Sequence, residues 1–216
     1  MKEEKRQYRQ IEQYIKNPDF LNRQQEAIDY VISQVEIMNR ELSGRFRRDV
    51  VDSVVFRTKS AESIKKKLVR KGLPVDIKSI EEELNDLTGI RITCAFSDDV
   101  YRIAERLESN HHFNVIRIKD YIKSPKACGY QSLHMIMDVP VDGINVRTEI
   151  QLRTVAMNFW AKLDHQLAYK IAENEEMEKI QRELKFYAEE IARIDSKMLR
   201  VRKKIEKLQD KKVSDK

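Results

Sequence analysis

The chain has 216 residues, of which 41% are apolar and 36% are charged, and its 42 lysines and arginines outnumber its 36 acidic residues. This length allows one domain of roughly 150 residues with helical extensions. No run of about 18 apolar residues is present, and residues 1–9 lack the apolar core of a signal peptide. We therefore expect a cytoplasmic protein without a membrane span. Its net charge of +6 suits an anionic partner, a nucleotide or a nucleic acid, or is simply a solvated basic surface.

The glycines and cysteines exclude several kinds of site. The five glycines are isolated from one another: Gly44, Gly72, Gly89, Gly129 and Gly143. Neither a P-loop nor a dinucleotide-binding motif can be built from them, so any phosphate must be bound by side chains. Cys94 lies in an apolar run and Cys128 in a polar loop, without the spacing of a metal site or a disulfide framework.

The first half of the chain alternates predicted helices with a short strand. The first 20 residues are polar, and we expect them to be loosely ordered. From 21 to 42, apolar residues recur every three or four positions, which predicts a helix that Gly44 ends. Residues 54–56 predict a short buried strand.

Capping residues and alternation define the elements that follow. Ser60 caps a helix that runs to Lys71, and Ser79 with Glu82 forms a capping box for a short helix ending near Leu84. The alternation of GIRITCAF predicts a strand over 89–96, and a helix follows over 98–107. The remaining predicted elements are strands over 113–122, 133–139 and 144–152 and a helix from 154 to about 169. Asp142-Gly143 is a strong hairpin signal between the last two strands.

This order predicts one mixed five-stranded sheet with helices packed on it, an α+β fold with long helices at both ends. The C-terminal part repeats apolar residues with a period of 3.5 from Ile180 to Leu208, as in a helix that buries a seam. Its partner is either the N-terminal helix or another subunit. The chain thus divides into a helical extension (1–48), a core domain (49–172) and a coiled-coil-like helix (173–216). The basic residues over 197–212 are either a solvated tail or a nucleic-acid contact.

Polar residues gather on one face of the predicted hairpin. Around 144–152, Arg147, Glu149, Gln151 and Arg153 point away from the apolar row, and Tyr130 and His134 share a face before them. On the helix that starts at 154, Asn158, Lys162 and His165 form a polar stripe that would meet this face. If the hairpin brings these rows together, the face would suit a nucleotide. The alternative is the solvent-facing side of an antiparallel sheet.

Two carboxylates and a basic helix complete the candidate groups. Asp86 and Glu149 lie on or near neighbouring strands and could hold Mg²⁺ together with phosphate oxygens. Ser63 and Lys67 share one helix face, next to Arg57 and Lys59, and such a face can hold a triphosphate. The alternative is a solvated basic helix.

Several short segments form a recognisable series, which in chain order is Asp86–Arg91, Lys119–Ile122, Pro125-Lys126, Gly129–His134, Glu149–Thr154 and Met157–Ala161. These segments resemble the synthetase domain of RelA/SpoT proteins, and above all the small, single-domain alarmone synthetases. The resemblance covers about residues 50–170. The chain has no His-Asp dipeptide, so the family's hydrolase domain is not expected, and it is too short for the long members' regulatory region.

The resemblance implies a nucleotidyltransferase-like synthetase domain that acts as a GTP pyrophosphokinase. Such an enzyme transfers the β,γ-pyrophosphoryl group of ATP to the 3′-hydroxyl of GDP or GTP and releases AMP. It also implies a Mg²⁺ cofactor and a homo-oligomer, a tetramer as in the small synthetases. Regulation by RNA or by (p)ppGpp, and the preference for GDP or GTP, are left open.

The same resemblance assigns roles to individual residues. Asp86 and Glu149 would hold Mg²⁺, with Glu149 as the base near the 3′-hydroxyl. The ATP-binding residues would be Arg57 and Arg91 at the adenine and Lys59, Ser63 and Lys67 at the phosphates. The residues that position the guanosine nucleotide would be Lys119, Lys126, His134, Gln151, Asn158 and Tyr130, the last by stacking on guanine. Two other functions stay open, an RNA-binding module and a template-independent nucleotidyltransferase.

Overall fold

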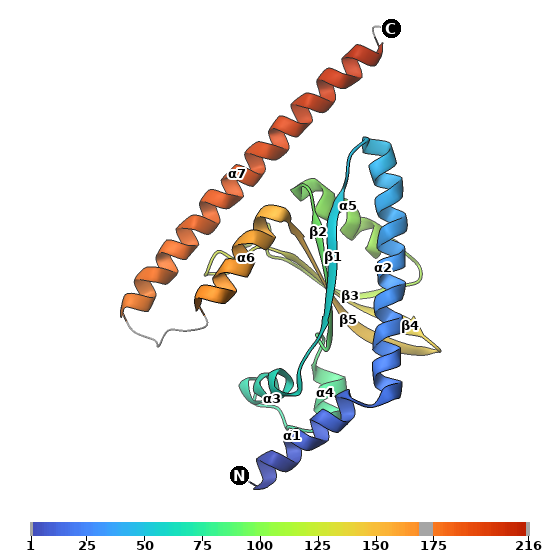
Figure 1. Ribbon diagram of the computed structural model, residues 1–216, viewed down its shortest axis with the longest axis vertical. Helices are drawn as coiled ribbons and strands as arrows, with labels where there is room; N and C mark the ends of the chain where they lie inside the picture. Colours follow the sequence, from blue (N-terminus) through green and yellow to red (C-terminus); the bar gives the residue numbers. More distant parts are fainter. Residues whose placement is uncertain (1, 169–174, 215–216) are drawn as a thin grey trace.

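The computed structural model describes residues 2–168 and 175–214 of the chain. Figure 1 shows its elements, which in order are α1 (Lys2–Ile15), α2 (Pro18–Phe46), β1 (Val51–Thr58), α3 (Ala61–Arg70), α4 (Ile77–Glu83), β2 (Thr88–Cys94), α5 (Ser97–Glu108), β3 (Asn114–Asp120), β4 (Leu133–Val141), β5 (Ile144–Thr154), α6 (Val155–Ala168) and α7 (Glu175–Ser214). The order from β1 to α6 is the one the sequence predicts, and the α+β class is confirmed.

The five strands form one mixed sheet in the order β1-β2-β5-β4-β3. Strands β2 and β5 are parallel, and the other three pairs are antiparallel. The predicted hairpin turn lies between β4 and β5, where Asp142 and Gly143 both have positive φ, 46° and 76°. That backbone twist matches the twist of the two strands.

The sheet has one apolar and one polar face because side chains alternate along each strand. Ile90, Ile92, Met135, Ile150 and Leu152 lie in the main hydrophobic core with the buried residues of α2 and α5. Cys94 is buried in this core, as the sequence predicts, and Cys128 is exposed. The opposite face is left to the polar side chains, and α6 packs against β5 and β2 there.

Strand β1 differs from its prediction. The strand is present, but Val55 and Phe56 are 49% and 50% exposed, so the expectation of a buried strand was wrong. Strand β1 lies at the edge of the sheet with β2 as its single neighbour. Val51 and Val54 still pack against the main core, whereas Val55 and Phe56 stay largely uncovered.

The N-terminal residues are more ordered than the sequence predicts. Residues 2–15 form α1, whose Ile11 is 1% exposed and packs with Ile64, Leu68 and Ile80 of α3 and α4. The expectation of a loosely ordered segment was wrong because this second core covers one apolar side of a very polar helix.

Two helix boundaries were also wrong. Helix α2 does not end at Gly44 but continues to Phe46, and Arg47 ends it with a φ of 52°. A single glycine inside a helix costs only about 1 kcal/mol, less than the buried face of α2 contributes. Helix α4 is capped by Asp76, which accepts from the backbone N–H of Ser79 at 2.8 Å, so Ser79 lies inside the first turn.

Helix α7 packs on α6 and α5, and most of the predicted heptad seam lies outside the packed face, although Ile191 of the seam lines the contact with α6. Ala188 and Arg202 are 5% and 7% exposed on the packed face, whereas Ile194, Met198 and Ile205 of the seam are half exposed. Helix α2 therefore does not cover the seam, and Figure 1 places α2 across the sheet from α7.

Ion pairs hold α7 to the N-terminal end of α5. Arg202 of α7 pairs with Asp98. Arg48, which follows α2, links the two helices: it lies 3.4 Å from Glu206 of α7 and donates to both oxygens of the fully buried Asp99 at 2.7 and 2.8 Å. Within the described residues, no helix combines the length and apolar composition that crossing a bilayer requires.

Candidate active site

An open cavity of about 750 Å³ lies over the polar face of the sheet. Its volume is within the range of small-molecule sites. The residues that line it are Arg57, Asp86, Arg91, Lys126, Tyr130, His134, Glu149, Gln151, Arg153, Ala161, Lys162, Asp164, His165 and Gln166. They come from β1, β2, β4, β5, α6 and two loops, so the cavity exists only in the folded chain.

Strand register explains why the polar residues meet. Gln151 of β5 lies opposite Arg91 of β2 and His134 of β4, and Glu149 lies opposite Gly89. Residues opposite each other on neighbouring strands point to the same face. The predicted convergence of the two polar rows is therefore confirmed.

Asp86, in the loop between α4 and β2, is held by two lysines. Lys59 Nζ and Lys67 Nζ lie 2.6 and 2.7 Å from the same oxygen, Oδ2. The other oxygen, Oδ1, is buried without a hydrogen-bond partner. Burial opposes ionisation, but the hydrogen bonds and charges of the two lysines hold the pKa of Asp86 below its usual range. The group is thus a carboxylate with one oxygen free for a ligand.

Glu149 is held by hydrogen bonds instead of ion pairs to lysine. Its Oε1 lies 3.2 Å from His134 Nδ1, and its Oε2 accepts from Gln151 Nε2 at 2.7 Å. Burial would raise the pKa of Glu149, but hydrogen bonds from His134 and Gln151 hold it below its usual value. The charge of Asp86 acts in the opposite direction, which shows that the two carboxylates influence each other.

Two arginines lie at the β1–β2 side of the cavity. Arg57 and Arg91 also line a smaller groove of about 130 Å³ together with the exposed Val55 and Phe56. Burial and the charges of Arg153 and Arg57 lower the pKa of Arg91. Planar guanidinium groups beside apolar side chains suit an aromatic base.

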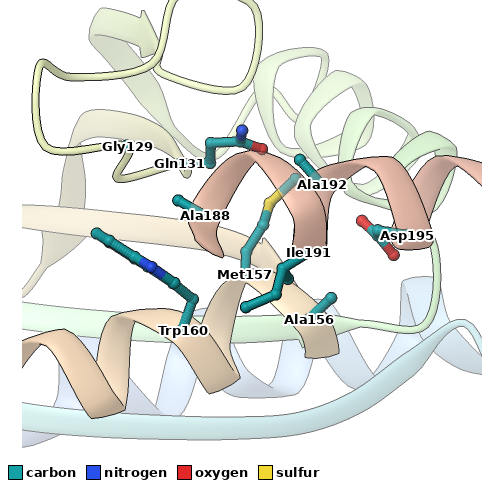
Figure 2. Close-up of a pocket in the computed structure, with 9 residues that line it drawn as sticks. All are labelled: Gly129, Gln131, Ala156, Met157, Trp160, Ala188, Ile191, Ala192 and Asp195. Atoms are coloured by element: carbon teal, nitrogen blue, oxygen red, sulfur yellow. The ribbon is translucent and has the colours of Figure 1, made fainter. Parts of the chain in front are cut away.

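The loop that carries Tyr130 rests on α7 and α6. Gly129 has a φ of 91°, and a Cβ atom at this position would lie 2.6 Å from the Cβ of Ala188. Figure 2 shows the loop beside the turn of α7 that carries Ala188. Trp160 Nε1 of α6 donates to the carbonyl of Leu184 at 3.1 Å, and the cavity enclosed between these parts is only about 10 Å³. The contact thus positions the loop and leaves no room for a ligand.

Five of the predicted site residues do not line the cavity. Lys59 and Lys67 stand behind it and reach it through Asp86. Ser63 lies in the first turn of α3, where its hydroxyl bonds that of Ser60 at 3.0 Å. Lys119 is exposed on β3, opposite His134. Asn158 of α6 has a buried Oδ1 atom without a partner.

Three further lining residues belong to polar rows that the sequence predicts but were given no role in the site. Arg153 extends the alternating row of Glu149 and Gln151. Lys162 and His165 lie one turn apart on α6, and helical spacing places them on one face.

Residues 56–174 match the family model for the region found in RelA/SpoT proteins. The chain belongs to the RelA/SpoT family. Within it, the chain is 36% identical over 184 residues to the GTP pyrophosphokinase YwaC of Bacillus subtilis, covering 83% of this chain and 87% of that protein. It is also 36% identical over 163 residues to the GTP pyrophosphokinase YjbM of the same organism, covering 74% and 75%.

Solved structures agree with this family assignment. The small alarmone synthetase 1 of Bacillus subtilis, bound to its product pppGpp, superimposes with a TM-score of 0.77 at 31% identity. The match covers 87% of this chain and 96% of that one. The small alarmone synthetase 2 of the same organism gives a TM-score of 0.74 at 34% identity and covers 88% and 99%. The resemblance to the small alarmone synthetases is confirmed.

Proposed function

We propose that this chain transfers the β,γ-pyrophosphoryl group of ATP to the 3′-hydroxyl of GDP or GTP and releases AMP. The chain is a GTP pyrophosphokinase, like the relatives that match most of its length. The observation that supports the reaction best is the pairing of two ionised carboxylates, Asp86 and Glu149, in one cavity lined by cations. Such a site suits a reaction whose main requirements are positioning and charge neutralisation.

The donor would lie on the β1–β2 side. Arg57 and Arg91 would enclose adenine, and Lys59, Ser63 and Lys67 would bind the phosphates. The two lysines support this role because their ammonium groups already gather at the cavity through Asp86. Lysine side chains are long and flexible, so their ammonium groups can leave the Asp86 carboxylate and bind the incoming polyphosphate instead.

Asp86 and Glu149 fit the Mg²⁺ that pyrophosphoryl transfer needs. Asp86 has a buried oxygen without a partner, and both residues supply the hard oxygen ligands that Mg²⁺ prefers. Among the described residues, no group of three or more His, Cys, Asp or Glu forms a ready-made metal site. The two carboxylates would therefore share the ion with phosphate oxygens, whose negative charge it neutralises.

The acceptor would lie over β4 and β5. Tyr130 would stack on guanine, and Lys119, Lys126, His134, Gln151 and Asn158 would position the nucleotide. Glu149 would take the proton of the 3′-hydroxyl as that oxygen attacks the β-phosphorus. The bond from this phosphorus to the oxygen of the α-phosphate then breaks, and AMP leaves.

The decisive experiment incubates the purified chain with γ-labelled ATP, Mg²⁺ and either GDP or GTP. We expect label on the 3′ position of the guanosine nucleotide and one AMP for each product. Release of pyrophosphate in place of AMP would instead identify a nucleotidyltransferase. The ratio of kcat/KM for the two acceptors gives the preference that the sequence leaves open.

We also propose that the chain forms a homo-oligomer, a tetramer. The support is the apolar seam of α7, where Ile194, Met198, Val201, Ile205 and Leu208 are 48% to 62% exposed. A single helix with such a seam gains stability by pairing it. Light scattering should report a multiple of the 25.7 kDa chain mass, and Met198→Glu with Ile205→Glu should reduce it. A wild-type mass of one chain at micromolar concentration would refute the oligomer.

The division into 1–48, 49–172 and 173–216 also stays a proposal, as does the cytoplasmic location. The family match over 56–174 supports the middle unit, and residue 48 lies between α2 and β1. The boundary at 172 lies outside the described residues.

A regulatory RNA and regulatory (p)ppGpp are further predictions, which salt-dependent binding measurements would test.

A further inference from the structure

Arg153 is an unusual residue in this site. It is 5% exposed, and within the described residues no carboxylate forms an ion pair with it. Its Nε atom is buried without a hydrogen-bond partner. Burying an unpaired cation is costly, so its retention at this position needs a reason.

The tip of the side chain is occupied by two residues of the site. Arg153 Nη2 donates to Tyr130 Oη at 2.6 Å and to Gln151 Oε1 at 3.0 Å. Its Cζ also lies 4.9 Å from the centre of the Tyr130 ring, within the range of a cation–π contact. Arg153 therefore holds Tyr130 by both its hydroxyl and its ring.

These contacts complete a closed network of hydrogen bonds that ends on Glu149, the proposed catalytic base. Tyr130 Oη lies 2.8 Å from His134 Nε2, and His134 Nδ1 lies 3.2 Å from Glu149 Oε1. Gln151 Nε2 donates to the other oxygen of Glu149 at 2.7 Å. The network thus connects Arg153 to Glu149 in two ways, one through Tyr130 and His134 and one through Gln151.

The chemistry of the two ends sets the direction of every bond between them. Arginine can only donate and an ionised carboxylate can only accept. Tyr130 accepts from Arg153, so its own hydrogen is free for His134 Nε2, and Nδ1 then carries the hydrogen that faces Glu149. Gln151 must likewise turn its carbonyl to Arg153 and its amide to Glu149.

We propose that Arg153 is a positioning residue for the acceptor half of the site. It fixes the ring of Tyr130 for the guanine base and orients the hydrogen bonds that end on both oxygens of Glu149. This inference rests on the proposed function, because it assumes that the nucleotide acceptor stacks on Tyr130. Nothing in it requires Arg153 to touch a substrate.

A direct contact with a phosphate is the competing role for a buried arginine. The structure favours positioning, because Nη2 is already used by Tyr130 and Gln151 and because Arg57 in the same cavity is exposed while Arg153 is not. The two roles differ in which substrate they affect. Positioning acts on the guanosine nucleotide, whereas a phosphate contact at the donor would act on ATP.

The test uses Arg153→Lys, which keeps the charge but loses the forked geometry. We expect the KM for GDP to rise about tenfold, the size typical of losing a hydrogen bond from a charged group. The KM for ATP should stay within twofold of the wild type. An equal rise in the KM for ATP, or no rise for either substrate, would overturn the inference.

Tyr130→Phe provides a second test that does not depend on the fold of the arginine variant. It keeps the ring that stacks on guanine and removes only the hydroxyl that Arg153 holds. We expect GDP to bind several-fold more weakly, and Arg153→Lys to add much less in this background than it does alone. Wild-type GDP affinity in Tyr130→Phe, or full additivity of the two changes, would contradict a role exerted through the hydroxyl.

GDP binding is measured by calorimetry without ATP, and thermal unfolding checks the fold of each variant. This separates the inference from the function on which it rests. Wild-type protein that binds GDP but transfers nothing would overturn the proposed function, and the GDP affinities of the variants would still test the positioning role of Arg153. Wild-type protein that binds no GDP would overturn both.

Discussion

The two carboxylates of the site are held ionised by different means. Asp86 is paired with two lysines through a single oxygen, whereas Glu149 receives one hydrogen bond on each oxygen. Both have a lowered pKa in spite of their burial. The proposed donor half is therefore compensated by the charges of lysine side chains, and the proposed acceptor half by hydrogen bonds from side chains of β4 and β5.

We infer from this difference that the surroundings of Asp86 rearrange when substrate binds, whereas those of Glu149 do not. The lysines around Asp86 are available for exchange, because a polyphosphate and a divalent ion together can replace the ion pairs. The groups around Glu149 keep their places, because His134 and Gln151 lie on the paired strands β4 and β5. A preorganised carboxylate beside a cluster of lysines suits the proposed reaction between a flexible polyphosphate and one sugar hydroxyl.

Glu149→Gln should have the largest effect on activity. The change keeps the shape of the side chain but removes the proton acceptor, and general-base catalysis contributes typically 10²- to 10⁴-fold. We expect kcat to fall by about that factor while GDP binding changes little. Steady-state rates and calorimetry measure both quantities, and a kcat within tenfold of wild type would show that Glu149 is not the base.

Asp86→Asn should have the next largest effect. It removes one proposed metal ligand and leaves Lys59 and Lys67 without their carboxylate, so we expect kcat/KM to fall about a hundredfold and the Mg²⁺ concentration for half-maximal rate to rise. Metal titrations of the rate measure this.

Glu62→Gln is the matched control for Asp86→Asn. Glu62 pairs with Lys66 on the outside of α3 at 2.7 Å, and both side chains are more than two-thirds exposed. The control should leave rate and metal dependence unchanged. A similar loss in both variants would indicate a general effect of charge and not a metal ligand.

Gly129→Ala should have a moderate effect, confined to the acceptor half. A Cβ at this position would meet the Cβ of Ala188 at 2.6 Å, and the positive φ alone costs about 1–2 kcal/mol. We expect a several-fold higher KM for GDP, because the loop that carries Tyr130 must shift. The KM for ATP should not change.

Gly143→Ala separates the effect of the positive φ from the effect of the contact with Ala188. Gly143 also has a positive φ, 76°, but a Cβ there would have no neighbour within 4 Å. Its variant should lose stability without affecting the KM for GDP, and Ala188→Gly should partly restore the Gly129→Ala variant. Equal kinetic effects of the two glycine changes would rule out the contact with α7 as the cause.

The pH dependence of stability should show the smallest effect. The folded-state pKa of Asp86 lies below its ordinary value of about 3.9. Its contribution to stability is thus present above the ordinary value and is lost as the pH falls through the lower, folded-state value. As the pH falls below 5, the free energy of unfolding should decrease more steeply for the wild type than for Asp86→Asn, as measured by denaturant unfolding at each pH. Parallel curves would show that the lysine pairs do not hold the carboxylate ionised.

The sequence by itself determined the order of elements from β1 to α6, the β4–β5 hairpin and the polar row that contains Glu149 and Gln151. These features follow from local patterns, namely a period of two along strands and a turn that needs positive φ. Asp86 and Glu149 could be singled out as candidates for the same reason, because each lies on or beside a strand that a local pattern predicts.

Only the tertiary structure decided which of these groups touch. The sequence placed Lys59, Lys67 and Asp86 near a site but did not pair them, and it placed Arg153 in the polar row without giving it a role. It also marked the seam of α7, while the fold packs the face with Ala188 and Arg202. Contacts between residues far apart in the chain depend on register, on which face a helix presents and on the shared burial of charges. No local pattern records these, because each is settled by the free energy of the whole packed arrangement.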